Sequence, residues 1–474
     1  MPSIVNDVKN VKNQETVTKQ EKLYEQYRRK TTKMDPEEVK KLNRPFTLTG
    51  KIFSVLFIIL CIFAIWRLTA RSEQLYFLGG LMFVYLLITE FFALLYKPCK
   101  KDLTKDYKVT VIITCFNENP SSVVTIFENI LTFDYPVHEI LFLDDGSKDP
   151  LAYEVAKSFA EDHENSPNMP NMPKFQIMRF EENRGKRAVM IDGFKVASGD
   201  YVFLLDSDSE IFPNALTELL RTFEDDKTTS CVGNIGILNK RENFLTMLQS
   251  ITYYNAFQFG RAAQSVTGNV VVCSGAFSIH KKDFIVDNLE AFEKDLYCGV
   301  KVSAGDDRAL TTIAKITGGK TRYQGTAYCE TECPNTWRKF ISQRRRWQRS
   351  AYLQGLKSIK DVFPRKFWYI FWVFAEAYFW LIAAVIFIIS AIVTGLCLDL
   401  IDIALYFIII KYKMSVFYLL YRPIHFLLAP IYLFVYGISL VYTRIHAAVT
   451  LKDDNWGTRV SKDKKKSKRL QAQQ

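Results

Sequence analysis

The sequence lacks the motifs by which many proteins hold phosphate groups. It contains neither a P-loop lysine motif nor a G-x-G-x-x-G pattern, so any bound phosphate would need other contacts. Its nine cysteines are scattered. Cys329 and Cys333 have no second cysteine or histidine pair nearby, which argues against a zinc site. The pattern resembles no disulfide framework and suits a reducing compartment.

The first 45 residues also lack a long apolar run, so we expect no cleaved signal peptide. Hydrophobic residues make up 49% of the chain and concentrate near residues 52–96 and 367–446. This distribution predicts membrane spans on either side of one globular domain. Much of the net charge of +12 lies beside the apolar runs, as in the cytosolic flanks of membrane proteins. We therefore expect a lipid bilayer as partner and no nucleic acid.

Composition divides the chain into six predicted segments. They are a charged cytosolic segment, two transmembrane helices, a cytosolic globular domain, amphipathic interface helices, C-terminal transmembrane helices and a basic cytosolic tail. Their ranges are, in that order, 1–50, 51–97, 98–335, 336–366, 367–448 and 449–474. The basic flanks place the globular domain in the cytosol.

Two details of the apolar segments need an explanation. Glu90 interrupts the second run, and an intramembrane carboxylate has either a function or a place near the interface. The last segment reads as three apolar blocks, which would place the basic tail outside the cell. We therefore expect one block to be broken or re-entrant, at Arg422, Pro423 or Pro430.

In the middle segment, strands alternate with helices. Runs at 109–114, 140–143 and 201–205 are suited to buried strands, and helical stretches near 120–133, 150–162 and 186–197 separate them. This alternation predicts an α/β domain with a mostly parallel sheet covered by helices on both faces. Ligands bind beyond the carboxyl ends of the strands in such sheets, and two acidic clusters fall there.

These two clusters are the first candidates for a site. Asp206 and Asp208 follow an apolar strand and have the oxygen ligands that a hard divalent cation prefers. Asp144 and Asp145 end another strand, and a carboxylate there can accept hydrogen bonds from a base or ribose. The following Gly146 allows close approach of the backbone. Taken singly, each cluster is more often a solvated turn.

Three further motifs carry suitable chemistry. Lys186 stands in a basic turn entering a helix, a suitable phosphate or uracil contact. One carboxylate of Asp306 and Asp307 can serve as a general base. The Gln343-Arg-Arg-Arg346-Trp347 run joins a guanidinium suited to phosphate with an indole suited to a sugar ring. Alone, this run would favour a basic amphipathic helix on a membrane surface.

Together these motifs resemble the membrane-processive glycosyltransferases of family 2. The order is DDG, D-x-D, GDD and then Q-x-x-R-W. The similarity extends to hyaluronan synthases of the streptococcal type, from about Leu95 to Arg459. Further similar stretches are Tyr254-Asn-Ala-Phe, Arg261-Ala-Ala-Gln-Ser265, Cys273-Ser-Gly275, Gly305-Asp-Asp-Arg308 and Trp456-Gly-Thr-Arg459.

The resemblance implies a GT-A-like cytosolic domain, an α-helical transmembrane region and a multi-pass plasma-membrane location. It implies inverting, processive transfer from UDP-GlcNAc and UDP-GlcA, with extrusion of the nascent polysaccharide. For the donor, the resemblance implies that Asp144 or Asp145 contacts the uracil, that Lys186 lies near the nucleotide, and that Asp206 and Asp208 lie on the diphosphate, Asp208 through Mg²⁺ or Mn²⁺. It implies that Asp307 is the catalytic base and that Gln343, Arg346 and Trp347 hold the diphosphate and the acceptor. Trp456 and Arg459 would close over the site.

Two departures keep the polymer open. Streptococcal-type synthases usually read SGP where this chain has Ser274-Gly-Ala276, and Q-Q-x-R-W where it has Gln343-Arg-Arg-Arg-Trp347. The Q-R-R-R-W form is typical of chitin synthases, and nodulation chitooligosaccharide synthases share the GKR and AAQS elements. The alternative is therefore a chitin or chitooligosaccharide synthase that uses UDP-GlcNAc alone. A non-enzymatic membrane scaffold or transporter would be expected to have lost Asp206, Asp208 and Asp307, which are all present.

Overall fold

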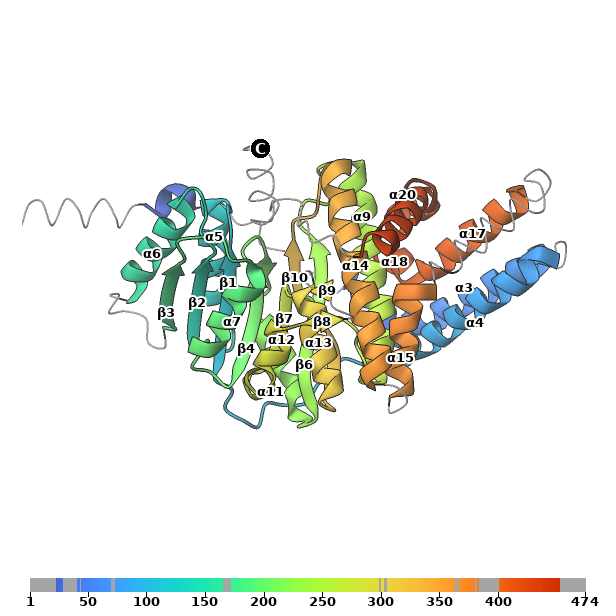
Figure 1. Ribbon diagram of the computed structural model, residues 1–474. Coiled ribbons are helices and arrows are strands. Elements are labelled where there is room, and N and C mark those ends of the chain that lie inside the picture. Colours follow the sequence, from blue (N-terminus) through green and yellow to red (C-terminus); the bar gives the residue numbers. More distant parts are fainter. Residues whose placement is uncertain are drawn as a thin grey trace, which may run out of the picture.

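A mixed eight-stranded sheet forms the centre of the chain (Figure 1). The computed structural model describes residues 23–28, 41–42, 44–69, 73–164, 172–297, 300–301, 305–362, 366–379, 382 and 400–451. Trp456, Arg459 and the basic tail, for which the sequence makes predictions, lie outside the described residues. The sheet has the order β3-β2-β1-β4-β7-β6-β10-β5. Its strands are β1 (Val109–Cys115), β2 (Glu139–Asp144), β3 (Lys174–Arg179), β4 (Tyr201–Asp206), β5 (Glu210–Ile211), β6 (Thr228–Ile237), β7 (Phe277–Lys281) and β10 (Lys320–Thr331), and β8 (Leu296–Tyr297) pairs with β9 (Val300–Lys301) separately.

The three strands expected from sequence are confirmed as β1, β2 and β4. They pair in parallel with β1 in the middle: Thr114 lies opposite Asp206 of β4, and Cys115 lies opposite Asp144 of β2. β-branched residues fill β1, and all but one of its residues are buried. The register therefore places two acidic strand ends on either side of one apolar strand.

The sheet is mostly parallel, as expected: of its eight described strands, only β5 and β7 run against the others. β7 runs antiparallel to both of its neighbours, β4 and β6, and β5 runs antiparallel to β10. The reason lies in the chain path before β7. Residues Ser274–Ala276 lie at the cavity beyond the carboxyl ends of the parallel strands. The chain therefore enters β7 from that edge.

Helices cover both faces of the sheet, as the alternating pattern predicts. One face packs on α5 (Pro120–Leu131) and α6 (Leu151–Glu164), the other on α7 (Lys186–Val196) and α13 (Asp306–Ile316). Asn119 caps α5 by accepting a hydrogen bond from Ser121 N, and Pro120 occupies its first turn. The remaining helices of the domain are α8 (Ala215–Leu220), η3 (Arg221–Glu224), α9 (Phe244–Asn255), η4 (Ala256–Arg261), α10 (Ala262–Val266), α11 (Lys282–Asp287) and α12 (Leu289–Glu293).

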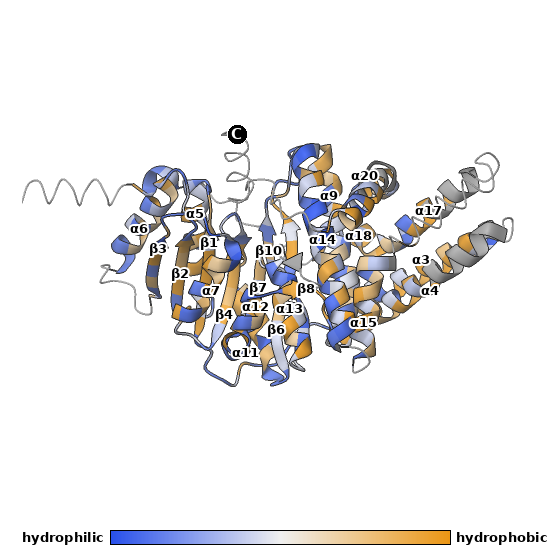
Figure 2. Cartoon of the chain, in the orientation of Figure 1, coloured by the Kyte–Doolittle hydropathy of each residue, from blue (hydrophilic) through white to orange (hydrophobic). Residues whose placement is uncertain are grey.

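The apolar helices extend from one end of this domain. α3 (Leu48–Thr69), α4 (Glu73–Leu95) and α17 (Leu400–Met414) run side by side away from the sheet (Figure 1). Among the described residues, one stretch, Leu48–Arg67, is long and apolar enough to cross a membrane, with a mean hydropathy of 2.5. Hydrophobic residues run along it (Figure 2), and several large side chains, such as those of Leu56, Leu60 and Phe63, are exposed. Val84–Leu95 is a shorter apolar helix.

The C-terminal helices pack against the domain instead of standing apart from it. They are α14 (Trp337–Val362), α15 (Phe367–Phe374), η5 (Ala375–Phe379), α18 (Val416–Tyr421), α19 (Pro423–Phe426) and α20 (Ala429–Val449). The break expected near Arg422 and Pro423 is present between α18 and α19. Tyr254 stacks on Tyr421 with ring centroids 5.0 Å apart, and Asn255 donates a hydrogen bond to Ser415. The Tyr254-Asn-Ala-Phe stretch therefore docks these helices on the domain.

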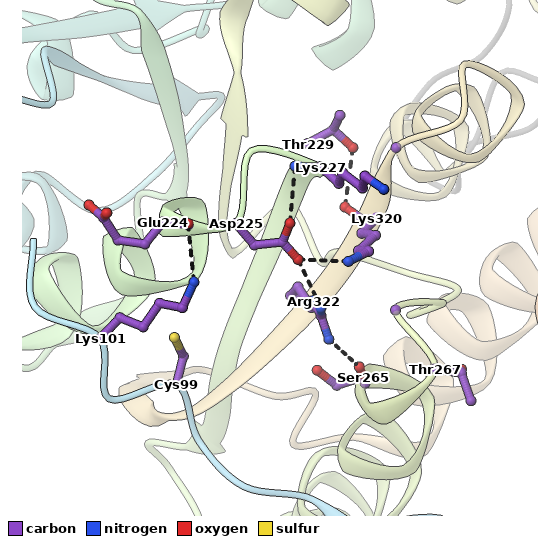
Figure 3. Close-up of polar contacts among 12 residues, drawn as sticks. Cys99, Lys101, Glu224, Asp225, Lys227, Thr229, Ser265, Thr267, Lys320 and Arg322 are labelled. Carbon is purple, nitrogen blue, oxygen red and sulfur yellow. Dashed lines mark hydrogen bonds and ion pairs between the residues drawn. The ribbon is translucent and has the colours of Figure 1, made fainter. Parts of the chain in front are cut away.

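A polar cluster at the amino end of β6 and β10 ties the chain leaving α4 to the sheet (Figure 3). The Lys101 ammonium donates a hydrogen bond to the carbonyl of Glu224. Asp225 accepts hydrogen bonds from Lys320 at 2.8 Å and Arg322 at 3.1 Å. Burial alone would raise the pKa of Asp225, but these hydrogen bonds outweigh it and lower the pKa to about 2. The linker after the apolar helices is thereby held to the base of the sheet.

Glu90 has a partner within the apolar helices. Its Oε2 lies 2.6 Å from Nζ of Lys413 on α17, and both side chains are buried. Removing one member of a buried ion pair leaves an uncompensated charge, whereas replacing both by apolar residues avoids that penalty. The pair therefore joins α4 to α17.

We predict that Lys413→Met destabilises the protein by on the order of 3 kcal/mol, because Glu90 is left buried without a counter-charge. The measurement is the melting temperature of the detergent-solubilised protein. The matched control is Glu90→Leu with Lys413→Met, which should melt close to the parent. Equal losses in the single and double variants would contradict a paired role.

Candidate active site

The candidate site lies where the chain direction across the sheet changes. From β1 the chain proceeds to β2 and β3 on one side, and β4 lies on the other side. Such a switch point opens a crevice beyond the carboxyl ends of the strands, where ligands bind in open α/β sheets. The loops after β1, β2 and β4 meet there, and two of them carry the predicted acidic clusters.

Asp144 and Asp145 build the loops at this edge. Asp144 accepts hydrogen bonds from Ser147 N and Oγ and from Arg179 Nε, the last at 3.1 Å. Asp145 accepts hydrogen bonds from the backbone N–H groups of Arg184, at 2.7 Å, and of Gly185. Both carboxylates are buried. They hold the turn that enters α7, and their contact with uracil stays a prediction.

Lys186 begins α7 and reaches across to β4. Its Nζ lies 2.5 Å from Oδ1 of Asp206. Asp208 accepts a hydrogen bond from Thr331 Oγ1 at 3.2 Å. Burial raises the pKa of Asp208 to about 7, and the charges of Asp206 and Glu118 add to this. The two carboxylates of the D-x-D pair therefore differ: one is paired with a lysine, and the other lies in an excess of negative charge.

The two carboxylates of the second pair, Asp306 and Asp307, also have different partners. Asp306 accepts a hydrogen bond from Arg187 Nε at 2.6 Å and is buried. Asp307 accepts one from the backbone N–H of Arg308 at 2.8 Å. Burial raises the pKa of Asp307, and the Arg308 charge opposes this. A carboxyl with a raised pKa is a stronger base when ionised, so Asp307 is the member suited to accept a proton.

The first half of α14 forms the opposite wall. Gln343, Arg346 and Trp347 lie on it, and the buried Oε1 of Gln343 has no hydrogen-bond partner among the described residues. The Arg344 guanidinium lies 4.4 Å from the Trp347 ring centroid and 5.9 Å from that of Tyr253. This wall offers cationic groups and an aromatic face beside one another.

One cavity of about 350 Å³ joins these groups. It is lined by most of the predicted site residues, namely Lys186, Asp206, Asp208, Asp307, Gln343, Arg346 and Trp347. Asp144 and Asp145 do not line it, because their side chains are used within the loops beneath. Trp456 and Arg459 lie outside the described residues. The structure therefore brings together residues up to 161 positions apart in sequence, from Lys186 to Trp347.

Sequence reasoning assigned no role to several groups around this cavity. Arg261 and Arg308 line it, and both lie near Glu376 of η5. A carboxylate in an otherwise apolar run was the signal for Glu376. Asn117 is not part of the lining; it lies in the loop after β1, has a positive φ of 56° and accepts a hydrogen bond from Lys148 N. The sequence Asn117-Glu118-Asn119 at a strand end was its signal.

Two family models match the chain. The model described as glycosyl transferase family 2 matches residues 110–289, and the model described as glycosyl transferase family group 2 matches residues 201–443. The second match spans half of the chain and includes most of the cavity residues. The chain therefore belongs to the family 2 glycosyltransferases, enzymes that transfer a sugar.

Two individual relatives show which members of the family this chain is similar to. A hyaluronan synthase from Streptococcus pyogenes serotype M3 is 32% identical over 384 residues, which cover 80% of this chain and 90% of the relative. An N-acetylglucosaminyltransferase from Bradyrhizobium diazoefficiens is 30% identical over 247 residues, 52% of this chain and 49% of that protein. The chain is thus similar to a hyaluronan synthase over nearly the full length of that relative.

A solved structure shows the same fold. A mannosyltransferase from Pyrobaculum calidifontis, in complex with GDP-Man and Mn²⁺, superposes with a TM-score of 0.56 at 20% identity. The match covers 80% of this chain and 96% of that chain. At this identity the likeness concerns the fold alone, and it agrees with the expected GT-A-like domain.

The contact between Gly305 and Ser350 provides a test of this geometry. Gly305 precedes Asp306 and Asp307 and has a φ of +83°, and a Cβ there would lie 1.8 Å from Ser350 Oγ on α14. We predict that Gly305→Ala lowers kcat by about 10- to 100-fold, because it pushes the start of α13 away from α14. The measurement is release of nucleoside diphosphate from the sugar donor by membranes that contain equal amounts of protein.

Gly318 is the matched control for this substitution. It follows the other end of α13 with a φ of +94°, and a Cβ there would meet nothing within 4 Å. Gly318→Ala carries a similar backbone strain of about 1–2 kcal/mol but no clash. It should therefore keep kcat near that of the parent. Equal loss of activity in both variants would show that backbone strain, and not the helix contact, is responsible.

Proposed function

We propose that this chain is a processive, inverting glycosyltransferase that polymerises hyaluronan from UDP-GlcNAc and UDP-GlcA and extrudes it across the plasma membrane. One observation carries the proposal: a single cavity combines Lys186, Asp206 and Asp208 on one wall with Asp307 and the Gln343–Trp347 helix on the others. The similarity to a hyaluronan synthase over 90% of that relative supports the choice of polymer.

In the proposed reaction, Asp307 acts as general base. A hydroxyl oxygen of the acceptor sugar attacks the anomeric carbon of the donor, and the bond from that carbon to the diphosphate oxygen breaks. The hydroxyl proton passes to Asp307, and UDP leaves with the bonding electron pair. The electrostatics of Asp307 support this role, because burial raises its pKa and its pair-mate Asp306 is already engaged by Arg187.

The donor's nucleotide and diphosphate would be bound at the switch point. Lys186 and Arg346, which line the cavity, supply positive charge for phosphate oxygens. Asp144 and Asp145 would position the loop that contacts uracil. Trp347 offers an aromatic face for the acceptor sugar, beside Gln343 Oε1, which has no hydrogen-bond partner in the described part of the chain. Trp456 and Arg459 would close over the site.

The residues present fit a divalent cation at Asp208. Burial raises the pKa of this carboxylate, and the nearby negative charges of Asp206 and Glu118 raise it further. The described residues contain no group of three or more His, Cys, Asp or Glu side chains that could hold a metal. This suits Mg²⁺ or Mn²⁺, which one or two carboxylates hold together with substrate phosphates. When bound, the cation would offset the charge of the departing diphosphate.

Fusion of the catalytic domain to membrane helices supports extrusion. Lipid offers sugar hydroxyls no hydrogen bonds, so a polar polymer needs a protein path across the bilayer. Glu376 of η5 pairs with Arg261 and Arg308, which line the cavity, and its backbone carbonyl accepts a hydrogen bond from Arg444 of α20 at 3.4 Å. We assign the channel to the C-terminal apolar helices, residues 367–448.

The alternative is a synthase that polymerises GlcNAc alone. The similarity to an N-acetylglucosaminyltransferase favours it, as does the Gln343-Arg-Arg-Arg-Trp347 sequence. The similarity to that transferase covers a smaller part of this chain than the similarity to the hyaluronan synthase. The hyaluronan assignment is therefore the leading proposal.

We predict that membranes containing the protein make long polymer only when both UDP-GlcNAc and UDP-GlcA are supplied. The measurement is incorporation of labelled sugar into high-molecular-weight product, with each nucleotide sugar omitted in turn. Membranes that lack the protein are the control. Long polymer from UDP-GlcNAc alone would replace the hyaluronan proposal with the chitin-type alternative.

We predict that Asp307→Asn lowers kcat by on the order of 10²- to 10⁴-fold, because an amide cannot accept the proton. UDP binding should remain within a few-fold of the parent, since Asp307 contacts the acceptor side. Asp226→Asn, a change in a surface pair with Lys105 away from the cavity, is the control and should leave kcat unchanged. Retained polymer synthesis by Asp307→Asn would refute the assignment of the base.

A further inference from the structure

Two arginines that line the cavity are held by a carboxylate to which the proposed reaction assigns no role. Glu376 Oε1 accepts hydrogen bonds from Arg261 Nη1 at 2.5 Å and from Gln264 Nε2 at 2.8 Å. Its Oε2 lies 3.8 Å from Nη2 of Arg308. Glu376 belongs to η5, in the predicted channel segment, whereas the two arginines belong to the catalytic domain. The carboxylate therefore connects the apolar helices to two arginines in the wall of the cavity.

Arg308 is the residue after the proposed base. Its backbone N–H donates a hydrogen bond to Asp307 Oδ1, while its guanidinium lies toward Glu376. A guanidinium paired directly with a carboxylate lowers the pKa of that carboxylate by about 1–3 units and makes it a weaker base. The direction taken by the Arg308 side chain therefore decides how strong a base Asp307 is.

The backbone is irregular on both sides of this contact. Arg261 ends the π-helical turn η4, and Glu376 lies in the π-helical turn η5. π-Helical turns are rare and frequently occur at functional sites, because they redirect side chains that a regular helix would place elsewhere. Here two such turns face one another through the Arg261–Glu376 ion pair. The geometry favours a dedicated contact over an incidental one.

We propose that Glu376 is a positioning residue that holds the Arg308 guanidinium away from Asp307 and so preserves the strength of the base. This inference rests on the proposed function of Asp307. It also means that the position of the channel helix bears directly on the chemistry, because η5 carries the carboxylate that engages Arg308.

The charges around Asp307 decide in which direction its pKa changes when Glu376 is replaced. On its own helix it is flanked by Arg308 and Asp306, and Lys186 faces it from α7. Arg261 from η4 and Arg346 from α14 line the same cavity. Burial raises the pKa of Asp307, and Arg308 lowers it. When a neutral residue replaces Glu376, the Arg308 guanidinium is released toward Asp307. The pKa of Asp307 then falls, and Asp307 becomes a weaker base.

The test is the pH profile of kcat for Glu376→Gln, measured as UDP release from membranes with saturating Mn²⁺ and nucleotide sugars. Saturation with the cation keeps Asp208 ionised, so that its titration does not enter the comparison. A base must be deprotonated, so activity is lost as pH falls through its pKa. We expect the acidic limb to shift by about one pH unit to lower pH and the plateau to fall about tenfold.

Three further variants separate positioning from general damage. The matched control is Glu90→Leu with Lys413→Met, which removes a buried ion pair away from the cavity and should leave the limb in place. Glu376→Gln with Arg308→Gln should show no downward shift, because the guanidinium is gone. Glu376→Asp keeps the charge but shortens the reach, and should shift the limb in the same direction by less. Glu376→Asp takes the place of Glu376→Gln in the test if the Glu376→Gln protein does not accumulate in the membranes.

An unchanged acidic limb in Glu376→Gln and Glu376→Asp, whatever the loss of activity, would overturn the proposal. An equal downward shift in the double variant with Arg308→Gln would overturn the role of Arg308. These outcomes are distinct from failure of the proposed function. If the proposed function itself is wrong, the parent protein would release no UDP, or Asp307→Asn would remain active.

Discussion

The parallel pairing of β1 with β2 and β4 is the constraint on which the site depends. Its register sets Asp144 and Asp206 at the ends of the two strands that flank β1, at one edge of the sheet. Because β1 is almost fully buried and rich in β-branched residues, a one-residue slip would turn its side chains to the wrong faces. The core therefore fixes the positions of the acidic groups. The loops that carry Lys186 and Asp208 are then placed by short connections.

Within this frame, the protein divides its carboxylates by giving each a different partner. Asp306 and Asp206 are neutralised by Arg187 and Lys186, respectively. Asp307 and Asp208 keep raised pKa values because burial is not offset by a full counter-charge. Groups of the same residue type thereby acquire different chemistry: some hold the structure, whereas the others are suited to take a proton or a cation.

The apolar helices pack beside the cavity, and one of them engages two arginines that line it. α18 docks on Tyr254 and Asn255, and η5 places Glu376 beside Arg261 and Arg308. Two arginines against one carboxylate leave positive charge at the wall of the cavity, which suits a site for anionic donors. In the proposed function, the catalytic site and the path of the polymer therefore share one set of buried charges.

Much of the site could be predicted from local sequence. The runs that became β1, β2 and β4 are apolar and β-branched, the acidic clusters follow them directly, and the order of motifs resembles a known family. The family and the enzyme class were thus determined by sequence, and comparison confirmed both. The antiparallel placement of β7 could not be predicted in this way. It depends on where the preceding segment leaves the chain in space, and no local pattern encodes that.

Only the tertiary structure decided which carboxylates of each motif are available for chemistry and which are occupied by structural hydrogen bonds. Asp144 and Asp145 look as reactive in sequence as Asp307, yet Arg179 and the backbone of Arg184 and Gly185 occupy their oxygens. Likewise, Glu376 and Arg308 are 68 residues apart, and only the fold brings them to 3.8 Å. Sequence determines the chemical groups that a chain possesses. Burial and distant partners decide which of them stay free to react, because desolvation and ion pairing act across space.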